Sequence, residues 1–323
     1  MKISVIFTGG TIGSCIKDDF IGVDSKMQYV LLKDYENDNE IAFETSSPYS
    51  ILSENLSANE LNLLQKKITE KLAGDFDGII VTHGTDTLQY TSTAMEYIFG
   101  NAEIPIVFVS ANYPLDNENS NGFANFKAAV EFIRAEISKG VFVSYKNQNE
   151  LHTNIHIPSH IFQHNECDAD IYSIDNSVFA TYNGHFTLKN TEYEIHKAVK
   201  SVEFKENSGI LVVSSAPGQS YSFSLENVKA ILIKSYHSAT LNTSNESFVK
   251  FCKTASEKNI PVFVTGTKNG AGYESTRTYD ELNIIPLPYG TFISAYIKIW
   301  IAINGKYDIK EFMKKPIANE IIR

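Results

Sequence analysis

The sequence predicts an α/β protein with a larger, mostly parallel N-terminal sheet carrying helices on both faces, plus a smaller C-terminal α/β domain. Three observations predict this class. Short apolar runs alternate with segments of helical period over the first 150 residues, as right-handed βαβ units require. The alternation returns after residue 207. Between the two, from Leu151 to about Phe204, the chain is polar and turn-rich, so we expect a hairpin or edge strands there and then a linker.

Each N-terminal element follows from a local pattern. Ser57 and Glu60 form a capping box ahead of apolar residues that recur every three or four positions, which predicts a helix ending at Gly74. The other strands are predicted at 3–7, 78–81, 104–109 and 141–145, and the other helices at about 86–99 and 121–138.

The C-terminal elements follow the same rules. Strands are predicted at 209–215, 230–234 and 261–265, and helices at 245–258, 291–303 and 308–313. In the penultimate helix Phe292, Tyr296 and Trp300 recur every four residues, which is typical of a core face. We therefore expect an N-terminal domain at 1–190, a linker at 191–206 and a C-terminal domain at 207–323.

Composition excludes several classes of function. The formal net charge is −10 and the pI about 5.3, without a basic stripe, which argues against a nucleic-acid partner. No apolar run approaches the ~20 residues of a membrane span, and the N-terminus lacks the pattern of a secretory signal. Three scattered cysteines fit a reducing compartment, so we expect a cytoplasmic protein without disulfides.

Two glycine- and threonine-bearing turns carry the strongest chemical signal. The run Thr8–Gly13 follows the first strand, and Thr82–Thr87 follows the strand at 78–81. The carboxyl ends of parallel strands are where open α/β sheets bind ligands. Glycines let backbone N–H groups approach a carboxylate or an oxyanion, and the hydroxyls of Thr11 and Thr85 can attack a carbonyl or position water.

Simpler interpretations exist for both turns. The glycines at 9, 10 and 13 are not in the order of a dinucleotide fingerprint, and no clear acidic residue ends a second strand. Thr85 and Asp86 are also residue types that cap helices. Capping alone would not require the Thr-Gly-Gly-Thr turn as well.

The conjunction of the two turns resembles the bacterial-type L-asparaginase family, including its glutaminase-asparaginase relatives. The resemblance continues weakly at the Ser53–Leu56 loop and at the Val109–Ala111 run. It covers most of the chain, and its motifs are specific over the first 115 residues.

The resemblance implies an amidohydrolase that converts L-asparagine to L-aspartate and ammonia without a cofactor or metal. It makes Thr11 the nucleophile and Thr85 the residue that orients the attacking group or water. It also implies a homodimer or homotetramer, whose small-molecule amide substrate binds under a closing loop at Ser14–Val23.

Substrate-binding roles are implied as well. Asp86 is expected to hold the substrate α-amino group, and Ser53 with the Gly10 and Gly84 backbone the α-carboxylate. The Ala111 carbonyl is expected to accept a hydrogen bond from the leaving amide.

Three departures from the family pattern stand out. Phe20 occupies the loop position at which the family has a tyrosine, and a phenyl ring transfers no proton. No lysine occurs between Gln148 and Leu188, and Ser159 stands at the position of the family lysine. Glu54 follows Ser53 where an amide or a small polar side chain is commoner.

A histidine series is the candidate substitute for the missing base. His152, His156, His160 and His164 recur every four residues, and imidazole titrates near neutrality. Pro158 argues against a helix that would gather these histidines around a zinc ion. Two interpretations stay open: the histidines are ordinary solvated residues, or His160 or His156 acts as the catalytic base.

Weaker candidates complete the set. Cys15 lacks a supporting His or Asn motif, so we expect it to be incidental. The Tyr236–Ser238 run and Glu274 lie where the family reaches toward a neighbouring subunit, or are ordinary loop residues. An amidase of the same fold with another amide substrate, and an inactive amino-acid-binding homologue, stay open as alternatives.

Overall fold

The computed structural model describes residues 1–17, 20–24, 26–35, 39–266 and 272–322. The chain divides into two compact units. Unit 1 contains Met1–Ser201 and Ile317–Asn319, and unit 2 contains Val202–Pro316 and Glu320–Arg323. The division after Ser201 falls inside the linker expected at 191–206. The grouping of Ile317–Asn319 with unit 1 has no counterpart in the sequence pattern.

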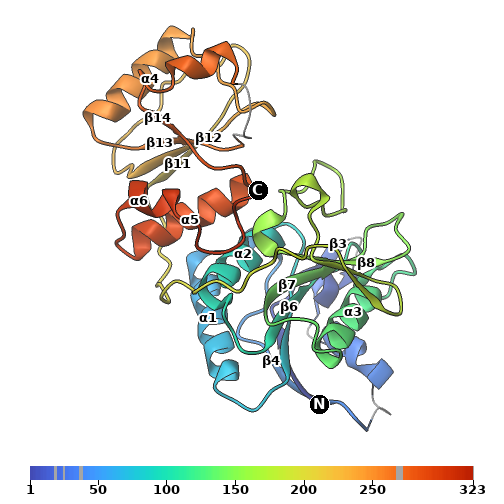
Figure 1. The fold of residues 1–323 in the computed structure, drawn as a ribbon. Helices are drawn as coiled ribbons and strands as arrows, with labels where there is room; N and C mark the ends of the chain where they lie inside the picture. Colours follow the sequence, from blue (N-terminus) through green and yellow to red (C-terminus); the bar gives the residue numbers. More distant parts are fainter. Residues whose placement is uncertain (18–19, 25, 36–38, 267–271, 323) are drawn as a thin grey trace. The chain divides into compact units, whose positions relative to one another are not determined.

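Unit 1 is built on a mixed sheet, which agrees with the predicted fold class (Figure 1). Its strand order is β10-β9-β8-β7-β6-β5-β1-β4. The parallel strands are β4 (Ala42–Ser46), β1 (Lys2–Phe7), β5 (Gly78–Thr82), β6 (Pro105–Val109) and β7 (Gly140–Tyr145). Antiparallel pairing then adds β8 (Thr153–His156), β9 (Ala180–Tyr182) and β10 (Phe186–Leu188). The polar stretch after Leu151 thus forms the expected edge strands.

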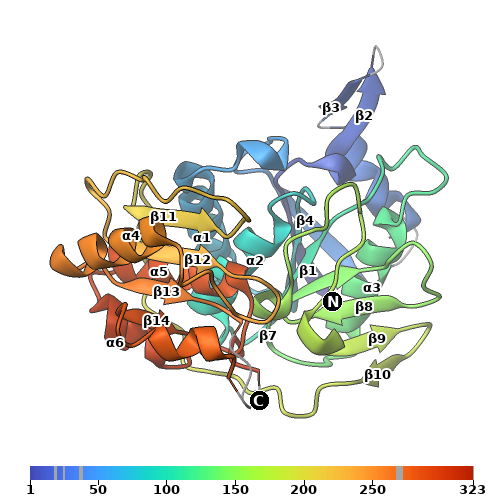
Figure 2. The ribbon, with the colours of Figure 1, turned by 90° about the horizontal axis from the view of Figure 1, so that it is seen from above.

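Helices cover both faces of this sheet. α3 (Gly122–Arg134) lies on one face, and α1 (Ala58–Leu72) and α2 (Leu88–Phe99) lie on the other (Figures 1 and 2). The capping box at Ser57 and Glu60 is present at the start of α1. Phe126, Phe132 and Ile133 of α3 are buried in one cluster with alternate residues of the central strands, such as Val5 and Val107. This burial holds α3 against the sheet, and the start of α3 therefore lies at a fixed place relative to the carboxyl edge.

Two predicted segments differ clearly from the structure. The helix predicted to run to residue 138 ends at Arg134, because Glu136 adopts a φ of 48° that an α-helix does not accommodate. The loop expected at Ser14–Val23 is an antiparallel hairpin of β2 (Ser14–Lys17) and β3 (Phe20–Val23). Figure 2 shows this hairpin extending away from the sheet of unit 1.

Unit 2 has a parallel sheet in the order β11-β12-β13-β14. Its strands are β11 (Ile210–Ser214), β12 (Ala230–Lys234), β13 (Val262–Val264) and β14 (Ile284–Pro286), and its helices are α4 (Glu246–Glu257), α5 (Phe292–Asn304) and α6 (Ile309–Lys314). Alternate residues of β12 serve opposite faces. Ile231 and Ile233 are buried with α4, whereas Ala230 and Leu232 are buried with α5. Among the described residues, no helix has the length and apolar character that crossing a bilayer requires.

The predicted core face of α5 is partly correct. Phe292 and Tyr296 pack, partly buried, against the cluster that includes Ile299. Trp300 instead lies near Phe204, with ring centroids 5.0 Å apart, and its indole N–H donates to the Lys205 carbonyl.

A buried ion pair anchors the C-terminal segment of unit 2. The Lys298 ammonium lies 2.6 Å from the Glu320 carboxylate, and the two side chains are 3% and 5% exposed. The same ammonium donates to the Lys315 carbonyl. Lys298 therefore holds the chain both where α6 has ended and near the C-terminus.

Breaking this pair from one side should destabilise the protein. Lys298→Met leaves the Glu320 carboxylate buried without its cation, which typically costs about 3–5 kcal/mol. The double variant Lys298→Met/Glu320→Leu removes both charges and should recover most of that loss. Urea unfolding of the single and double variants measures both effects. A single variant as stable as the wild type would contradict this role for the pair.

Candidate active site

The two glycine-bearing turns of unit 1 touch each other. A Cβ built on Gly10 would lie closer to the Gly84 backbone nitrogen than real Cβ atoms approach other atoms. A Cβ built on Gly84 would lie 2.5 Å from the Ser53 hydroxyl oxygen and 3.1 Å from the Gly10 Cα. Gly10 also has a φ of 75°, in the left-handed region that favours glycine. Three segments far apart in the sequence therefore meet at Gly10 and Gly84, where a Cβ atom would not fit.

Hydrogen bonds fix the first turn against its neighbours. The Thr8 hydroxyl is buried and donates to the Thr82 carbonyl at 2.6 Å. The Gly10 N–H donates to the Ile51 carbonyl at 2.8 Å, and the Ile51 N–H donates back to the Thr8 carbonyl at 3.1 Å. Sequence reasoning expected the Gly10 N–H to bind substrate. Because an N–H is a single donor and this one is bonded to Ile51, the Gly10 N–H holds the turn in place in this conformation and does not bind substrate.

Thr11 stands at the head of a 3-10 turn that spans Thr11–Gly13 and is partly exposed. The Gly10 carbonyl accepts from the Gly13 N–H at 2.9 Å and from the buried Ser14 hydroxyl at 2.7 Å. The backbone on both sides of Thr11 is therefore held by hydrogen bonds, which limits how far its side chain is displaced by loop motion.

The second turn separates β5 from α2. Thr85 is partly exposed and Asp86 is exposed, at the carboxyl end of the parallel strand β5. The N-cap residue of α2 is Thr87, and its hydroxyl donates to the Ser53 carbonyl at 2.9 Å. Neither Thr85 nor Asp86 is the N-cap residue, so the simple capping interpretation does not describe them.

Ser53 and Glu54 occupy different environments. Ser53 is buried at the start of the 3-10 turn Ser53–Asn55, beside Gly84. Glu54 is exposed. The structure therefore brings Ser53, but not the Glu54 carboxylate, into the contact between the two turns.

A buried neutral histidine supports the second turn. His83 is 2% exposed, and its Nδ1 lies 2.8 Å from the Gly84 carbonyl oxygen. Burial lowers the pKa of His83 to about 4, and the hydrogen bond to Gly84 offsets this only in part. Since the imidazole is neutral at pH 7, Nδ1 carries the proton and donates it to the carbonyl.

Ser159, at the position of the family lysine, and His160, the candidate base, both lie in the 3-10 turn after β8. The Ser159 N–H donates to the Glu96 carboxylate of α2 at 2.7 Å. His160 has both ring nitrogens engaged: Nε2 lies 2.6 Å from the Asn319 carbonyl oxygen, and Nδ1 lies 2.9 Å from the Ser177 hydroxyl. These contacts tie His160 to structural groups of unit 1.

The other histidines of the series do not share one environment. His156 ends β8 and is buried, with Nδ1 2.8 Å from the Ser173 hydroxyl, and burial lowers its pKa to about 3. His152 lies 3.9 Å from the Glu150 carboxylate at the surface. Pro158 starts a 3-10 turn directly after β8, so the four histidines do not lie on one α-helix. Within the described parts of the chain, no group of three or more His, Cys, Asp or Glu side chains is placed to hold a metal ion.

The remaining candidates lie in exposed segments. Phe20 is 78% exposed on the β2–β3 hairpin. The Cys15 thiol lies 3.8 Å from the Asp24 carboxylate at the base of that hairpin. In unit 2, Tyr236 is 38% exposed after β12, and Glu274 is exposed at the start of a 3-10 turn.

Sequence reasoning missed the groups that hold the two turns together. Thr8 belongs to the first turn but had no predicted partner, and Ile51 belongs to no recognised motif. Their contacts join segments more than 40 residues apart. The one local signal was a hydroxyl residue placed directly after a buried strand, at Thr8.

The close approach of the turns predicts a strong effect of a single methyl group. Gly84→Ala should move Ser53 or Gly10 and cost about 1–3 kcal/mol of unfolding free energy, as overpacking does. Gly22→Ala is the matched control, because a Cβ there meets nothing within 4 Å. Chemical denaturation compares the two variants. Equal stability of both would mean that the turns are not in contact.

The buried histidines also predict how stability depends on pH. The unfolded chain binds a proton on His83 below about pH 6.5, whereas the folded chain binds it only near pH 4. Stability therefore falls as pH drops from 6.5 toward 4, by up to about 3 kcal/mol for this one group. His83→Gln should flatten that part of the pH profile of unfolding free energy. The same substitution at the exposed His185 is the control for replacing a histidine by glutamine. Parallel profiles for His83→Gln and the wild type would contradict the buried neutral state.

The sequence is similar to those of known proteins. The family described as "Asparaginase, N-terminal" matches residues 2–182. L-asparaginase of Thermococcus kodakarensis is 24% identical over 99% of both chains. A glutamyl-tRNA(Gln) amidotransferase subunit of Methanococcus maripaludis is 26% identical over 99% of this chain and 80% of its own length.

Solved structures agree in fold. The thermostable L-asparaginase of Thermococcus kodakarensis superposes with a TM-score of 0.84 at 21% identity, covering 100% of both chains. L-asparaginase I of Vibrio cholerae gives a TM-score of 0.83 at 19% identity, covering 100% of this chain and 99% of its own. Because the family match spans more than half of the sequence, this protein belongs to the asparaginase family.

Proposed function

We propose that this protein hydrolyses the side-chain amide of L-asparagine to L-aspartate and ammonia, with Thr11 as the nucleophile. The observation that carries the proposal is the backbone contact between Gly10 and Gly84. It brings the turn that bears Thr11 next to the turn that bears Thr85 and Asp86, at the carboxyl ends of the adjacent parallel strands β1 and β5.

The reaction proceeds in two steps. The Thr11 hydroxyl oxygen forms a bond to the side-chain carbonyl carbon of asparagine, its proton passes to the departing nitrogen, and ammonia leaves as the carbon–nitrogen bond breaks. Water oriented by Thr85 then attacks the aspartyl ester. The water oxygen stays on the aspartate that leaves, and a proton of that water passes to the Thr11 oxygen as the ester bond breaks. Backbone N–H groups of the turns stabilise the oxyanion that develops in each step.

The remaining groups bind and orient the substrate. The exposed Asp86 carboxylate takes the α-amino group, and the Ser53 hydroxyl, adjacent to the Gly84 backbone, takes the α-carboxylate. The buried Ala111 carbonyl accepts from the amide nitrogen that leaves. Asp86 and Ser53 also set the distance between the α-centre and the reacting amide.

The base that assists Thr11 is the weakest part of this site. Phe20 supplies no proton acceptor, and the ring nitrogens of His160 already contact Asn319 and Ser177. A positioned base is worth about 10²–10⁴-fold in rate. We therefore expect slow turnover and a structural rather than basic role for His160, so that His160→Ala leaves ammonia release per folded molecule unchanged.

An amidase of the same fold acting on a different amide is the second candidate. The exposed Glu54 and the lack of lysine between Gln148 and Leu188 favour a changed substrate site. Relatives named as subunits of a glutamyl-tRNA(Gln) amidotransferase are also similar to this chain. An inactive homologue that only binds an amino acid is the third. For all three we expect a cytoplasmic homodimer or homotetramer that needs no cofactor.

Ammonia release separates these candidates. Wild-type protein, Thr11→Ala and Thr85→Ala are assayed with asparagine, glutamine and a panel of other carboxamides. Thr69→Ala, an exposed threonine on α1, is the matched control. We expect asparagine turnover that falls at least about 10³-fold in Thr11→Ala, since a lost nucleophile removes the covalent route, and that is unchanged in the control.

Other outcomes are equally informative. Turnover of another amide alone supports the second candidate, and saturable binding without turnover supports the third. Asparagine turnover that survives Thr11→Ala would overturn the proposed mechanism.

A further inference from the structure

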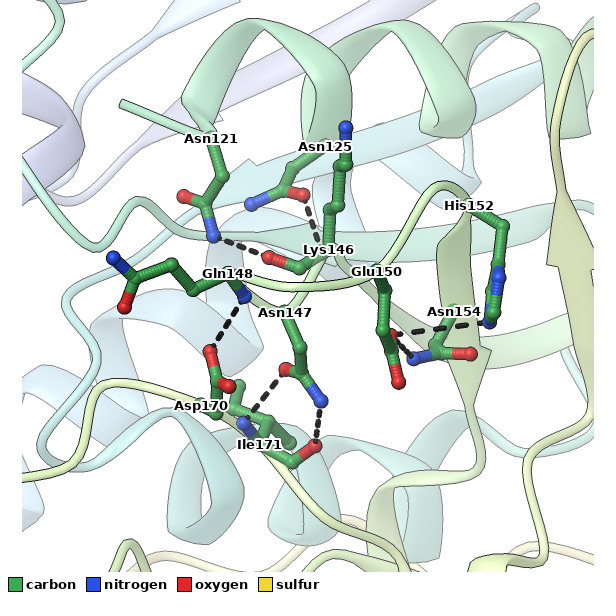
Figure 3. A network of polar contacts seen from close by, with 10 residues as sticks. All are labelled: Asn121, Asn125, Lys146, Asn147, Gln148, Glu150, His152, Asn154, Asp170 and Ile171. Atoms are coloured by element: carbon green, nitrogen blue, oxygen red, sulfur yellow. Dashed lines mark hydrogen bonds and ion pairs between the residues drawn. The ribbon is translucent and has the colours of Figure 1, made fainter. Parts of the chain in front are cut away.

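Two asparagine side chains hold the backbone at the carboxyl ends of β6 and β7. Figure 3 shows their contacts with Lys146, which follows β7. The Asn125 side-chain amide donates to the Ser110 carbonyl at 2.8 Å and accepts from the Lys146 N–H at 2.7 Å. The Asn121 side-chain amide accepts from the Asn112 N–H at 2.9 Å and donates to the Lys146 carbonyl at 2.7 Å. Both residues belong to the start of α3, and both are buried.

These clamps enclose Ala111 from both sides. The peptide plane that contains the Ala111 N–H also contains the Ser110 carbonyl, which Asn125 holds. The plane that contains the Ala111 carbonyl also contains the Asn112 N–H, which Asn121 holds. Since a trans peptide is planar, its C=O and N–H point in opposite directions. The Asn121 side chain therefore sets the direction in which the Ala111 carbonyl points.

Packing reinforces this geometry. A Cβ on Gly122 would lie 3.1 Å from the Ala111 Cβ and 2.5 Å from a Leu115 methyl group, so the first turn of α3 is in contact with Ala111. The Asn121 N–H also donates to the Asn112 side chain at 2.9 Å, which makes the Asn112–Asn121 contact reciprocal. Ala111 itself is fully buried.

We propose that Asn121 is a positioning residue that, with Asn125, aims the Ala111 carbonyl at the amide nitrogen of the substrate. This rests on the proposed function, in which that carbonyl accepts from the leaving amide. An aimed acceptor fixes the rotation of the amide so that its carbonyl carbon faces Thr11. Errors of about 1 Å in such alignment cost up to about 10²-fold in rate.

The test compares variants that differ in one hydrogen bond. Asn121→Ala removes the acceptor for the Asn112 N–H, whereas Asn121→Asp keeps it, and both lose the donor to the Lys146 carbonyl. We expect kcat to fall about tenfold in Asn121→Ala, with KM changed less than about threefold. We expect Asn121→Asp to recover most of kcat.

Asn147→Ala is the matched structural control. Asn147 is a buried amide of the same kind, which accepts from the Ile171 N–H at 2.9 Å and donates to the Ile171 carbonyl at 3.0 Å. Figure 3 shows the contacts of Asn147 and those of Asn121 in one view. Asn147 bonds to Ile171, which is not adjacent to Ala111 in the chain. Its loss should lower the unfolding midpoint with kcat unchanged.

Hydrogen exchange provides a readout that does not depend on activity. The Asn112 amide should exchange faster in Asn121→Ala than in Asn121→Asp. Equal kcat in Asn121→Ala and the wild type, or an equal loss of kcat in Asn147→Ala, overturns the inference while the proposed function stands. A wild-type protein that turns over no amide overturns the proposed function and this inference with it.

Discussion

The contact between the Gly10 and Gly84 backbones is the constraint on which the candidate site depends. Two turns at the ends of adjacent parallel strands, β1 and β5, come closer than any side chain would allow. Ser53 fills the remaining space beside Gly84, and its carbonyl accepts from Thr87. The sheet provides this proximity because parallel strands end at one edge, and the glycines convert proximity into contact. The positions of Thr11 and Thr85 follow from this backbone arrangement.

Around that contact, polar side chains hold the backbone in place. Thr8 binds the Thr82 carbonyl, His83 binds the Gly84 carbonyl, and Asn121 and Asn125 bind the segments after β6 and β7. Buried polar groups without partners are costly, so each of these pairs restricts the alternatives open to its loop. A site assembled from loops needs such support, because catalysis by alignment tolerates little displacement.

The sequence predicted the fold class, the capping box of α1 and the order of the central elements, because these depend on local period and on residues a few positions apart. The glycines and threonines of the two turns also led to the prediction of a candidate active site there. The sequence did not predict that the Gly10 N–H binds Ile51, that both nitrogens of His160 contact unit 1, or that β2 and β3 pair as antiparallel strands. Those features depend on which distant backbone groups meet, and neither hydrophobic period nor motif spacing encodes that. The family resemblance suggested Ala111 as a site residue, whereas the amides that hold its two peptide groups follow from the structure alone.

A crystal structure of the protein with L-aspartate, the proposed product, tests the central claim most directly. We predict that the side-chain carboxylate of the ligand lies between the Thr11 and Thr85 hydroxyls, with both hydroxyl oxygens within about 3.2 Å of it. A ligand bound elsewhere in the chain, or threonine side chains that point away from each other, would contradict the proposed site.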